Sequence, residues 1–445
     1  MTSIGATVIT LLVGASASFC GAQAPIIRSV DEKALREYAG TYQWEQNAFL
    51  YLQMWNELAG KNQLVAFDES GVVRTLYPTD RDRFFTGRAA AIPTAIESAI
   101  EFQRDGNGRI TSLTWRRGGT APRVARRVEI ERHEDVRFSS GDVLLSGTLI
   151  RPIDGETHPA MILVHGSGPA TREQILPFAR FLVRHGIAIL AYDKRGVNSS
   201  TGDWNTASFE DLAADVVSAF EYLKTRSDID SRQIGLLGVS QAGWVMPVAA
   251  VKAKDIAFLI SVSGAGVPAA ETTIDHARNE MIANGMKPEI IERIVGVMKL
   301  QYQFGRTGEG WNAYAAARDT LAARIGKPPE TFPDRTDHPY WQFIRRSYFY
   351  DPAPTLRQLR LPTLALFGEL DNNVLAAKNR AAWEAELRAS GNPDYTLHVV
   401  PKANHIQLEA KVGSNAEMAS LQRFVPEYFR IIQQWLEKRV RASPR

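Results

Sequence analysis

From about residue 130 onward, short apolar runs alternate with longer amphipathic stretches, and this alternation constrains the fold more than any other feature of the 445-residue chain. The apolar runs have the length of buried strands, and the stretches between them have the length and periodicity of helices. Strands that alternate with helices form a mostly parallel sheet with helices on both faces. The sequence therefore predicts an α/β fold. Its expected strands are 143–151, 159–164, 187–192, 233–239, 257–263, 363–367 and 395–400, and its expected helices are 173–185, 209–224 and 241–253.

The alternation stops at about residue 268 and resumes at about residue 355. The interval is helical in pattern and rich in aromatic residues, as in HPYWQFIRRSYFY, and it is inserted between two strands of the expected sheet. We therefore expect a helical cap at 268–354 that divides the α/β core into 131–267 and 355–440. Most aromatic side chains of the cap are expected to form its own core.

The N-terminal part, about 30–130, has a different pattern of short alternating runs separated by turn signals. The sequence DGNG at 105–108 suits the positive φ angles of a hairpin turn. These features predict a small antiparallel β domain. Residues 116–130 are rich in Arg and contain two adjacent glycines, so they are expected to form an exposed connector.

Residues 1–24 form an uncharged apolar stretch followed by small residues, which is typical of a cleavable secretory signal, although no Lys or Arg precedes the apolar run. The run is shorter than the roughly 20 residues that span a bilayer. Cys20 is the only cysteine, so the mature chain is expected to contain no disulfide. Phe19 before Cys20 does not match the small residue of a lipidation signal. We expect an exported protein, periplasmic or secreted, without a lipid anchor or a membrane span.

The charge of the chain is nearly balanced, with 52 Lys and Arg against 49 Asp and Glu, for a net charge of +3. The basic residues are scattered, so the sequence shows no electrostatic footprint for nucleic acid or for an anionic membrane. A neutral or weakly charged small molecule fits this composition better. No metal site or organic cofactor is indicated.

The strongest local motif is GVSQAG at 238–243, which follows an expected strand directly and begins an expected helix. A serine on such a sharp strand-to-helix turn is held outward at the end of the sheet, where it can act as a nucleophile. The motif differs from Gly-x-Ser-x-Gly by one methyl group, since Ala242 takes the last glycine position. We identify Ser240 as the candidate nucleophile.

A serine hydroxyl needs a histidine as its base, and the histidine needs an acid to hold it. For a serine on this kind of turn, the acid and then the histidine follow it along the chain. His405 lies just after the last expected strand and is our candidate base. Asp371 follows the strand at 363–367 and is our candidate acid, with Glu369 as the less favoured alternative. The other histidines either precede Ser240 or lie in the cap or within a strand: His133, His158, His165, His185, His276, His338 and His398.

The tetrahedral intermediate of acyl transfer carries an oxyanion, which needs two N–H donors fixed in advance. The residue after the nucleophile, Gln241, is expected to supply the first donor. The loop HGSGP at 165–169 follows an earlier strand, and the backbone N–H of Ser167 is our candidate for the second. We expect His165 to be structural, packed under this loop.

Together, HGSGP, YDKRGVNSSTG, GVSQAG, FGELDNNV and ANH resemble the α/β-hydrolase superfamily over about residues 130–440, and within it the branch of serine aminopeptidases, prolyl oligopeptidase-like enzymes and small-acyl esterases. The resemblance implies Ser240 as nucleophile, Asp371 as acid and His405 as base. The stretch at 193–196 (DKRG) resembles a structural strand-end segment of such proteins, and we assign it no catalytic role. The N-terminal β domain lies outside the resemblance.

The expected reaction is hydrolysis of a small carboxylic ester through an acyl-enzyme on Ser240. A serine peptidase or acyl-aminoacyl amidase acting on a short peptide is the alternative. It requires an acidic anchor for the substrate amine, for which Glu271, Asp275 and Glu280 are candidates. A catalytically silent binding protein on the same scaffold is the alternative outside enzymes. In the cap, Trp341 and Tyr348 suggest an apolar or aromatic acyl group.

Overall fold

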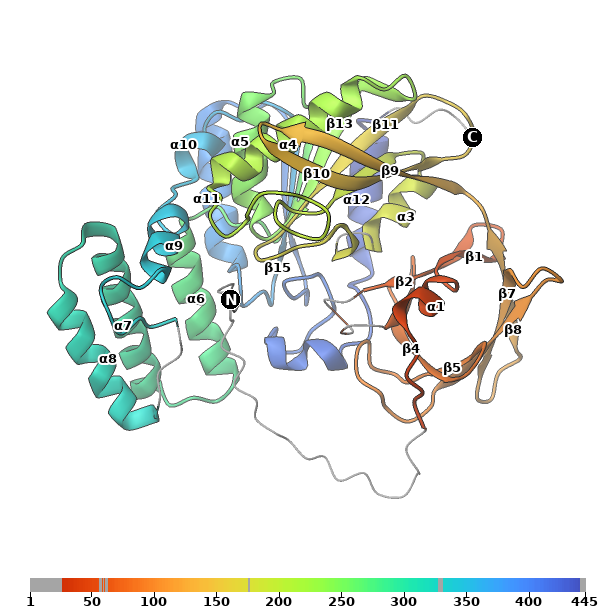
Figure 1. Ribbon diagram of the computed structural model, residues 1–445, viewed down its shortest axis with the longest axis horizontal. Helices are drawn as coiled ribbons and strands as arrows, with labels where there is room; N and C mark the ends of the chain where they lie inside the picture. The colour runs from red at the N-terminus through yellow and green to blue at the C-terminus, as the bar shows by residue number, and fades with distance from the viewer. Residues whose placement is uncertain are drawn as a thin grey trace.

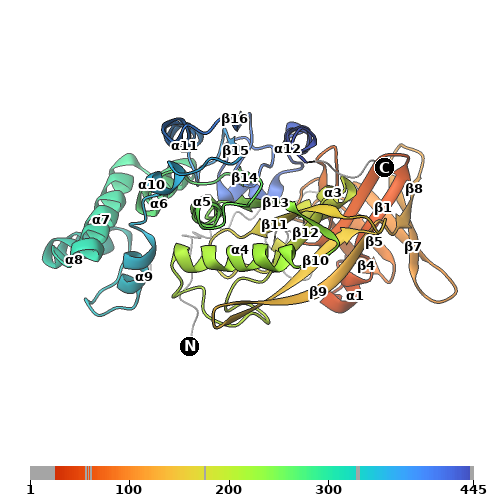
Figure 2. The ribbon, with the colours of Figure 1, turned by 90° about the horizontal axis from the view of Figure 1, so that it is seen from above.

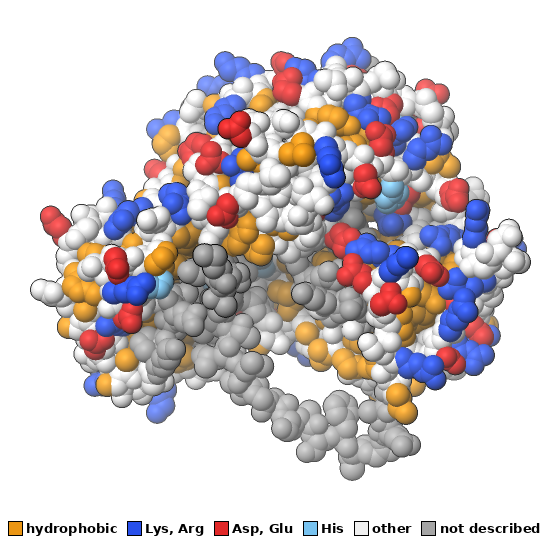
Figure 3. All heavy atoms as spheres, viewed as in Figure 1, with side chains coloured by type: hydrophobic (Ala, Val, Ile, Leu, Met, Phe, Trp, Pro, Cys, Tyr) orange, Lys and Arg blue, Asp and Glu red, His pale blue; other side chains and the backbone are white. Residues whose placement is uncertain are grey.

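The computed structural model describes residues 26–55, 58, 60, 63–174, 177–326 and 331–440. It has three parts: a β barrel, an α/β core and a helical insertion, with the barrel and the insertion on opposite sides of the core (Figure 1). The expected secretory signal at 1–24, with Cys20, lies outside the described residues. Within the described part, no helix has both the length and the apolarity needed to cross a membrane. Basic and acidic side chains are interspersed over the face seen in Figure 3.

The N-terminal part is a closed barrel in which each strand pairs with its neighbour in the sequence and β8 returns to β1. All its pairings are antiparallel, and the DGNG turn joins β6 to β7 as expected. A short helix, α1 (Glu32–Arg36), precedes it. The strands are β1 (Gly40–Glu45), β2 (Ala48–Met54), β3 (Leu64–Asp68), β4 (Val73–Asp80), β5 (Arg83–Thr86), β6 (Ser98–Arg104), β7 (Ile110–Arg117) and β8 (Arg123–Val128).

The prediction of an exposed connector at 116–130 is wrong, because this segment contains β8, the strand that closes the barrel. In the strand RVARRV, only Ala125 is buried, and it belongs to the apolar cluster inside the barrel. The arginines of this strand stay at the surface. A strand with so few apolar residues gives almost no periodic signal, so a turn-rich basic segment and an edge-closing strand look alike in the sequence.

The α/β core contains an eight-stranded sheet in the order β16-β15-β14-β13-β11-β12-β10-β9. Strands β11 to β16 run parallel to one another, and β10 and β9 extend the sheet by antiparallel pairing. The largely parallel sheet agrees with the expected fold, whereas β9 was not expected. The strands are β9 (Glu131–Ser140), β10 (Val143–Pro152), β11 (His158–Val164), β12 (Ala188–Tyr192), β13 (Ile229–Val239), β14 (Leu259–Val262), β15 (Thr363–Gly368) and β16 (Tyr395–Val400).

Helices cover both faces of this sheet (Figure 2). One apolar cluster joins the sheet to α4 (Phe209–Lys224), α5 (Ala242–Lys252) and α11 (Ala376–Ser390). A second cluster joins the other face to α3 (Pro177–Arg184) and α12 (Glu427–Glu437). Short helical turns complete the core: η1 (Arg172–Gln174), α10 (Ala353–Leu356) and η2 (Asn415–Ser420).

The helical insertion lies between β14 and β15 and has an apolar core of its own. Its helices are α6 (Ala269–Ala283), α7 (Pro288–Thr307), α8 (Trp311–Ile325) and α9 (Tyr340–Ser347). Trp341 is 1% exposed and packs edge-on to Phe304, so it is a core residue of the insertion and not part of a substrate pocket. Tyr348 contacts both the insertion and the α/β core.

The barrel meets the core through a continuous apolar interface. Outward-facing Tyr51 and Phe67 share an apolar cluster with Phe424 and Phe429 of the core. Backbone hydrogen bonds also join the two parts: Val73 N–H donates to Gln422 O over 3.1 Å, and Phe424 N–H donates to Gly71 O over 2.7 Å. The segment 419–425 of the core thus lies against the rim of the barrel.

Candidate active site

Ser240 lies at the turn between β13 and α5, with a φ of 60°. This left-handed conformation is strained for a residue with a side chain and is typical of a serine held outward for catalysis. The glycines beside it are required by packing: a Cβ on Gly238 would lie 2.3 Å from the Cβ of Ala242, and one on Gly243 would lie 2.6 Å from the Cα of Gly264. The GVSQAG motif therefore adopts the turn that the sequence predicts.

Asp371 and His405 come together at the same edge of the sheet. Asp371 follows β15 and His405 follows β16, and the carboxyl ends of parallel strands lie side by side. His405 Nδ1 lies 2.9 Å from Asp371 Oδ2 and 3.1 Å from Oδ1. The Asp371 side chain is fully buried and also accepts the N–H groups of Asn373 and Val374, each over 2.8 Å. The aspartate is thus fixed to orient the imidazole.

Glu369, the alternative acid, lies elsewhere in the same loop. Its Oε2 accepts the backbone N–H of Lys402 over 2.8 Å. This bond ties the loop after β15 to the loop after β16 without involving His405. Of the two carboxylates considered from the sequence, Asp371 is therefore the one that meets the histidine.

The loop that carries His405 is braced from the barrel side. Val425 N–H donates to Gln407 O over 2.9 Å, and Leu408 and Phe424 form an antiparallel bridge. Because segment 419–425 also bonds to the barrel rim, a continuous path of backbone hydrogen bonds runs from the barrel to the histidine loop. This gives the N-terminal domain a structural relation to the site that the sequence did not reveal.

The two segments expected to hold an oxyanion also meet near Ser240. A Cβ built on Gly166 would lie 3.7 Å from the Cβ of Ser240, so the HGSGP loop is within contact distance of Ser240. Gln241 is the N-cap of α5, where backbone N–H groups have no acceptor within the helix. Ser167 is exposed in the adjacent loop. Both expected donors thus come from segments that border Ser240.

His165 is buried beneath this loop, as expected. Its Nε2 bonds to the carbonyl oxygen of Tyr192, and its ring packs edge-on to the Tyr192 ring at 4.7 Å. Burial, together with the nearby Lys194 ammonium, lowers the pKa of His165 to about 3. The imidazole is therefore neutral and structural.

Sequence reasoning missed two residues near the site. Lys194, which we placed in a structural stretch, is 3% exposed and bonds to the HGSGP loop. His276, which we set aside as a cap residue, reaches Asn372 and Asn373 beside Asp371, and burial and the neighbouring His405 lower its pKa. Lys194 carried a usable signal, since a charged residue at the carboxyl end of a parallel strand lies where such sheets bind ligands. His276 carried none, because nothing local shows which way α6 faces.

The three carboxylates considered as amine anchors all have partners. Lys378 Nζ on α11 lies 2.6 Å from Asp275 Oδ2 and also contacts Glu271. Glu280 accepts the backbone N–H of Asn415 over 3.1 Å, and burial raises its pKa. These contacts attach α6 to the core, and they give each carboxylate a structural role.

The pattern that defines the α/β-hydrolase family matches residues 161–413, more than half of the chain. The chain belongs to the α/β-hydrolase family. Ser240, Asp371 and His405 all fall within the matched residues, and the eight-stranded sheet carries them at the carboxyl ends of its strands. The barrel, which ends at Val128, lies outside the match.

The chain is similar to several proteins at low identity. Esterase EstD of Thermotoga maritima is 23% identical over 274 residues, 60% of this chain and 59% of EstD. The quorum-quenching protein AidA of Acinetobacter baumannii is 29% identical over 128 residues, 28% of this chain and 42% of AidA. Dipeptidyl-peptidase 5 of Porphyromonas gingivalis is 24% identical over 318 residues, 68% of this chain and 37% of the peptidase. The chain thus spans less than two thirds of each of these relatives.

Among solved structures, an esterase of Pyrococcus furiosus aligns with a TM-score of 0.46 and 18% identity, covering 70% of this chain and 92% of that esterase. Est1E of Butyrivibrio proteoclasticus, in a structure with ferulic acid bound, aligns with a TM-score of 0.44 and 16% identity, covering 68% of this chain and 98% of Est1E.

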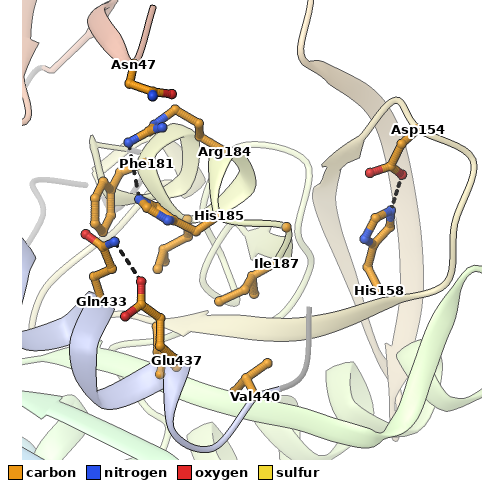
Figure 4. A pocket seen from close by; sticks show the side chains of 13 residues that line it. Asn47, Asp154, His158, Phe181, Arg184, His185, Ile187, Gln433, Glu437 and Val440 are labelled. Carbon is orange, nitrogen blue, oxygen red and sulfur yellow. Dashed lines mark hydrogen bonds and ion pairs between the residues drawn. The ribbon is translucent and has the colours of Figure 1, made fainter. Parts of the chain in front are cut away.

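A cavity of about 340 Å³ lies at the opposite edge of the eight-stranded sheet, near the amino ends of β11 and β12 (Figure 4). Asp154, His158 and His185 line it, and His158 Nε2 lies 2.7 Å from Asp154 Oδ1. This histidine-containing cavity includes none of Ser240, Asp371 and His405. Across the described residues, no group of His, Cys, Asp and Glu side chains is arranged to hold a metal ion.

Proposed function

We propose that this protein is a serine hydrolase that cleaves a small carboxylic ester through an acyl-enzyme on Ser240. The observation that carries the proposal is the pairing of His405 Nδ1 with the buried Asp371 carboxylate, at the same sheet edge as a serine with a φ of 60°. A nucleophile, an acid and a base in this order along the chain, on this fold, are the requirements of acyl transfer. The similarity to an esterase over 60% of the chain supports the same reaction class.

In the first step, Ser240 Oγ attacks the ester carbonyl while His405 Nε2 takes the serine proton. Because Nδ1 bonds to Asp371, the imidazole is held in the tautomer whose Nε2 accepts a proton. The aspartate then stabilises the imidazolium, which passes the proton to the leaving alcohol. In the second step, a water attacks the acyl-enzyme by the same route and releases the acid.

The oxyanion formed in each step is assigned to the backbone N–H groups of Gln241 and Ser167. The N-terminus of α5 adds its partial positive charge at this position, because Gln241 caps the helix. Donors fixed before the reaction are worth about 10²- to 10³-fold in rate each. This arrangement serves ester and amide substrates alike, so substrate class depends on the surrounding residues.

Ester substrates fit these surroundings better than peptides do. A peptidase that acts at an amino terminus needs a carboxylate to bind the substrate ammonium. In this chain, the ion pair with Lys378 occupies Glu271 and Asp275, and Glu280 bonds to the backbone of Asn415. An amine-binding subsite built on these three residues would first have to break those contacts. The similarity to a dipeptidyl-peptidase keeps the peptidase as the second candidate.

The experiment is turnover of p-nitrophenyl esters of increasing chain length by the wild type and by Ser240→Ala, with aminoacyl p-nitroanilides measured beside them. We expect ester turnover that falls by about 10⁴-fold or more in Ser240→Ala, with the fold retained. Ser227→Ala is the matched control, since Ser227 is exposed in the connection between α4 and β13, and the activity of this variant should stay within threefold of wild type. Faster anilide than ester cleavage would replace the esterase by the peptidase.

Labelling with a fluorophosphonate separates the enzyme from the non-catalytic alternative. We expect stoichiometric labelling of the wild type and none of Ser240→Ala, because the reagent reacts with a serine activated by its histidine. A wild-type protein that neither turns over a substrate nor reacts with the reagent would be a binding protein on a hydrolase scaffold.

A further inference from the structure

Lys194 is a buried lysine at the carboxyl end of β12, and it makes no ion pair within 4 Å among the described residues. Its Nζ donates to Gly166 O over 2.9 Å, to Gly168 O over 3.2 Å and to Gln241 Oε1 over 2.8 Å. The ammonium thus uses its three donors on three uncharged acceptors. Burying a charge without a counter-ion is costly, so its retention here indicates a specific role.

All three acceptors belong to the two segments assigned to the oxyanion. Gly166 and Gly168 flank Ser167, and Gln241 follows the nucleophile. In a trans peptide, the C=O and the N–H point in opposite directions. Holding the Gly166 carbonyl on Lys194 therefore turns the N–H of Ser167, which is in the same peptide group, away from the lysine and keeps it as a donor for a substrate oxygen.

The hydrogen bond from Lys194 to the Gln241 side chain acts on the second segment assigned to the oxyanion, which begins with Gln241. The Gln241 side-chain amide is drawn to Lys194, so its oxygen is engaged and does not compete for the backbone N–H groups beside Ser240. A hydrogen bond from an ammonium to a peptide carbonyl also polarises the peptide and strengthens its N–H as a donor. One side chain thereby orients both segments and places a positive charge behind them.

We propose that Lys194 is a positioning residue for acyl transfer, which fixes the Gly166–Ser167 peptide and the Gln241 side chain and whose charge favours the oxyanion. The inference rests on the proposed serine hydrolase activity and deepens it. A lysine that served stability alone would change the amount of folded protein and leave the properties of the folded enzyme unchanged.

The charge of Lys194 is expected to change near neutral pH. Burial without a carboxylate partner lowers the pKa of its ammonium to about 7, while Asp215 acts in the opposite direction. Among the titratable groups around Lys194, His165 is neutral because its pKa is about 3. Asp193 is paired with Arg172, and Asp215 is paired with Arg195. The active ammonium form is present below about pH 7, so kcat/KM should fall as the pH rises through that value.

The test compares Lys194→Met with wild type and with the surface control Lys252→Met, using an ester whose products are quantified by chromatography from pH 5.5 to 9. We expect kcat to fall by about 10²-fold in Lys194→Met, as for loss of one oxyanion donor, with KM within threefold. The decline on the alkaline side should disappear. Lys252 is exposed at the end of α5, and Lys252→Met should match the wild type.

Fluorophosphonate labelling of the wild type first shows whether Ser240 is the nucleophile, so failure of the proposed function is recognised separately. Given a labelled wild type, a kcat for Lys194→Met within threefold of wild type would overturn the role of Lys194. So would a loss that matches the unfolded fraction and leaves the pH profile unchanged. If the variant does not fold, the wild-type profile decides: a kcat/KM that is flat above pH 6.5 overturns the proposal, and a one-proton decline near pH 7 supports it.

Discussion

The barrel and the helical insertion are both additions to the α/β sheet, and they are joined to it by different forces. The barrel presents Tyr51, Phe67 and other apolar side chains to a cluster that continues into the core, and backbone hydrogen bonds seal the junction. The insertion has its own core, and α6 meets helix α11 and the loops of the core through an ion pair with Lys378 and through Glu280 and His276. Tyr348 is the aromatic residue shared by the insertion and the core.

The two junctions therefore differ in strength: the barrel is attached more firmly to the core than the insertion is. Apolar burial contributes about 25 cal/mol per Å² and is not screened by salt, so the barrel is firmly attached to the core. Partly exposed ion pairs contribute about 0–1 kcal/mol and weaken in salt. The insertion is therefore the part whose position against the site can change at low energetic cost.

The largest expected effect on stability is at the junction between the barrel and the core, in Phe424→Ala. Phe424 is fully buried, stacks on Trp55 at 5.8 Å and packs edge-on to Phe429 at 5.1 Å. Removing such a ring costs about 3–5 kcal/mol in the free energy of unfolding. Urea unfolding followed by fluorescence measures the loss, with Val124→Ala on the exposed face of β8 as the control. A loss below about 1 kcal/mol would show that the barrel is as loosely attached as the insertion.

A smaller effect is expected on the insertion side, in Lys378→Met. About a third of the Lys378 side chain is exposed, so loss of its bridge to Asp275 and Glu271 should cost less than about 1 kcal/mol. Urea unfolding in low and high salt measures it, and Lys299→Met on the exposed face of α7 is the control. The wild-type advantage should shrink in salt. A loss as large as that of Phe424→Ala would remove the contrast between the two junctions.

The smallest expected effect concerns pH and Glu280. Burial raises the pKa of this carboxyl, so the folded protein holds its proton more tightly than the unfolded chain does. Stability is therefore lost as the pH rises above the usual range of a glutamate. Glu280→Gln should remove this dependence and leave stability at pH 4 unchanged. The gain at pH 8 should be below about 0.5 kcal/mol, because the carboxylate is partly exposed and screened. Urea midpoints of wild type and variant at the two pH values test it, and a wild type that is more stable at pH 8 than Glu280→Gln contradicts it.

The sequence predicted the α/β sheet and the serine turn well because both depend on local patterns. Buried parallel strands are continuous apolar runs, and the GVSQAG turn needs small residues at fixed positions. The strands β8 and β9 escaped prediction because each exposes at least half of its side chains and carries few apolar residues. Closure of the barrel could not be predicted, since it depends on the pairing of β1 with β8, far apart in the chain.

The site was predictable in its chain order and not in its surroundings. Asp371 and His405 follow strand ends and carry the expected chemistry, and their pairing requires only that parallel strands end together. The role of Lys194 depends on where three oxygens from two other segments lie. The approach of His276, which lies more than 90 residues before Asp371, depends on the orientation of α6. Contacts of this kind arise from packing between segments and leave no periodicity in the sequence.

The link between the barrel rim and the histidine loop has a consequence for synthesis. Arg74 donates to the carbonyl oxygen of Gln422, a residue made 348 positions later. Until this segment has been synthesised, Tyr51 and Phe67 of the barrel are not covered by it. Exposed apolar side chains of this kind are suited to chaperone binding. A chain that ends just before residue 419 would already contain Ser240, Asp371 and His405. The loop after β16 would still lack its backbone hydrogen bonds to Phe424 and Val425. The site around Ser240, Asp371 and His405 would then be completed late in translation, after all three residues have been made.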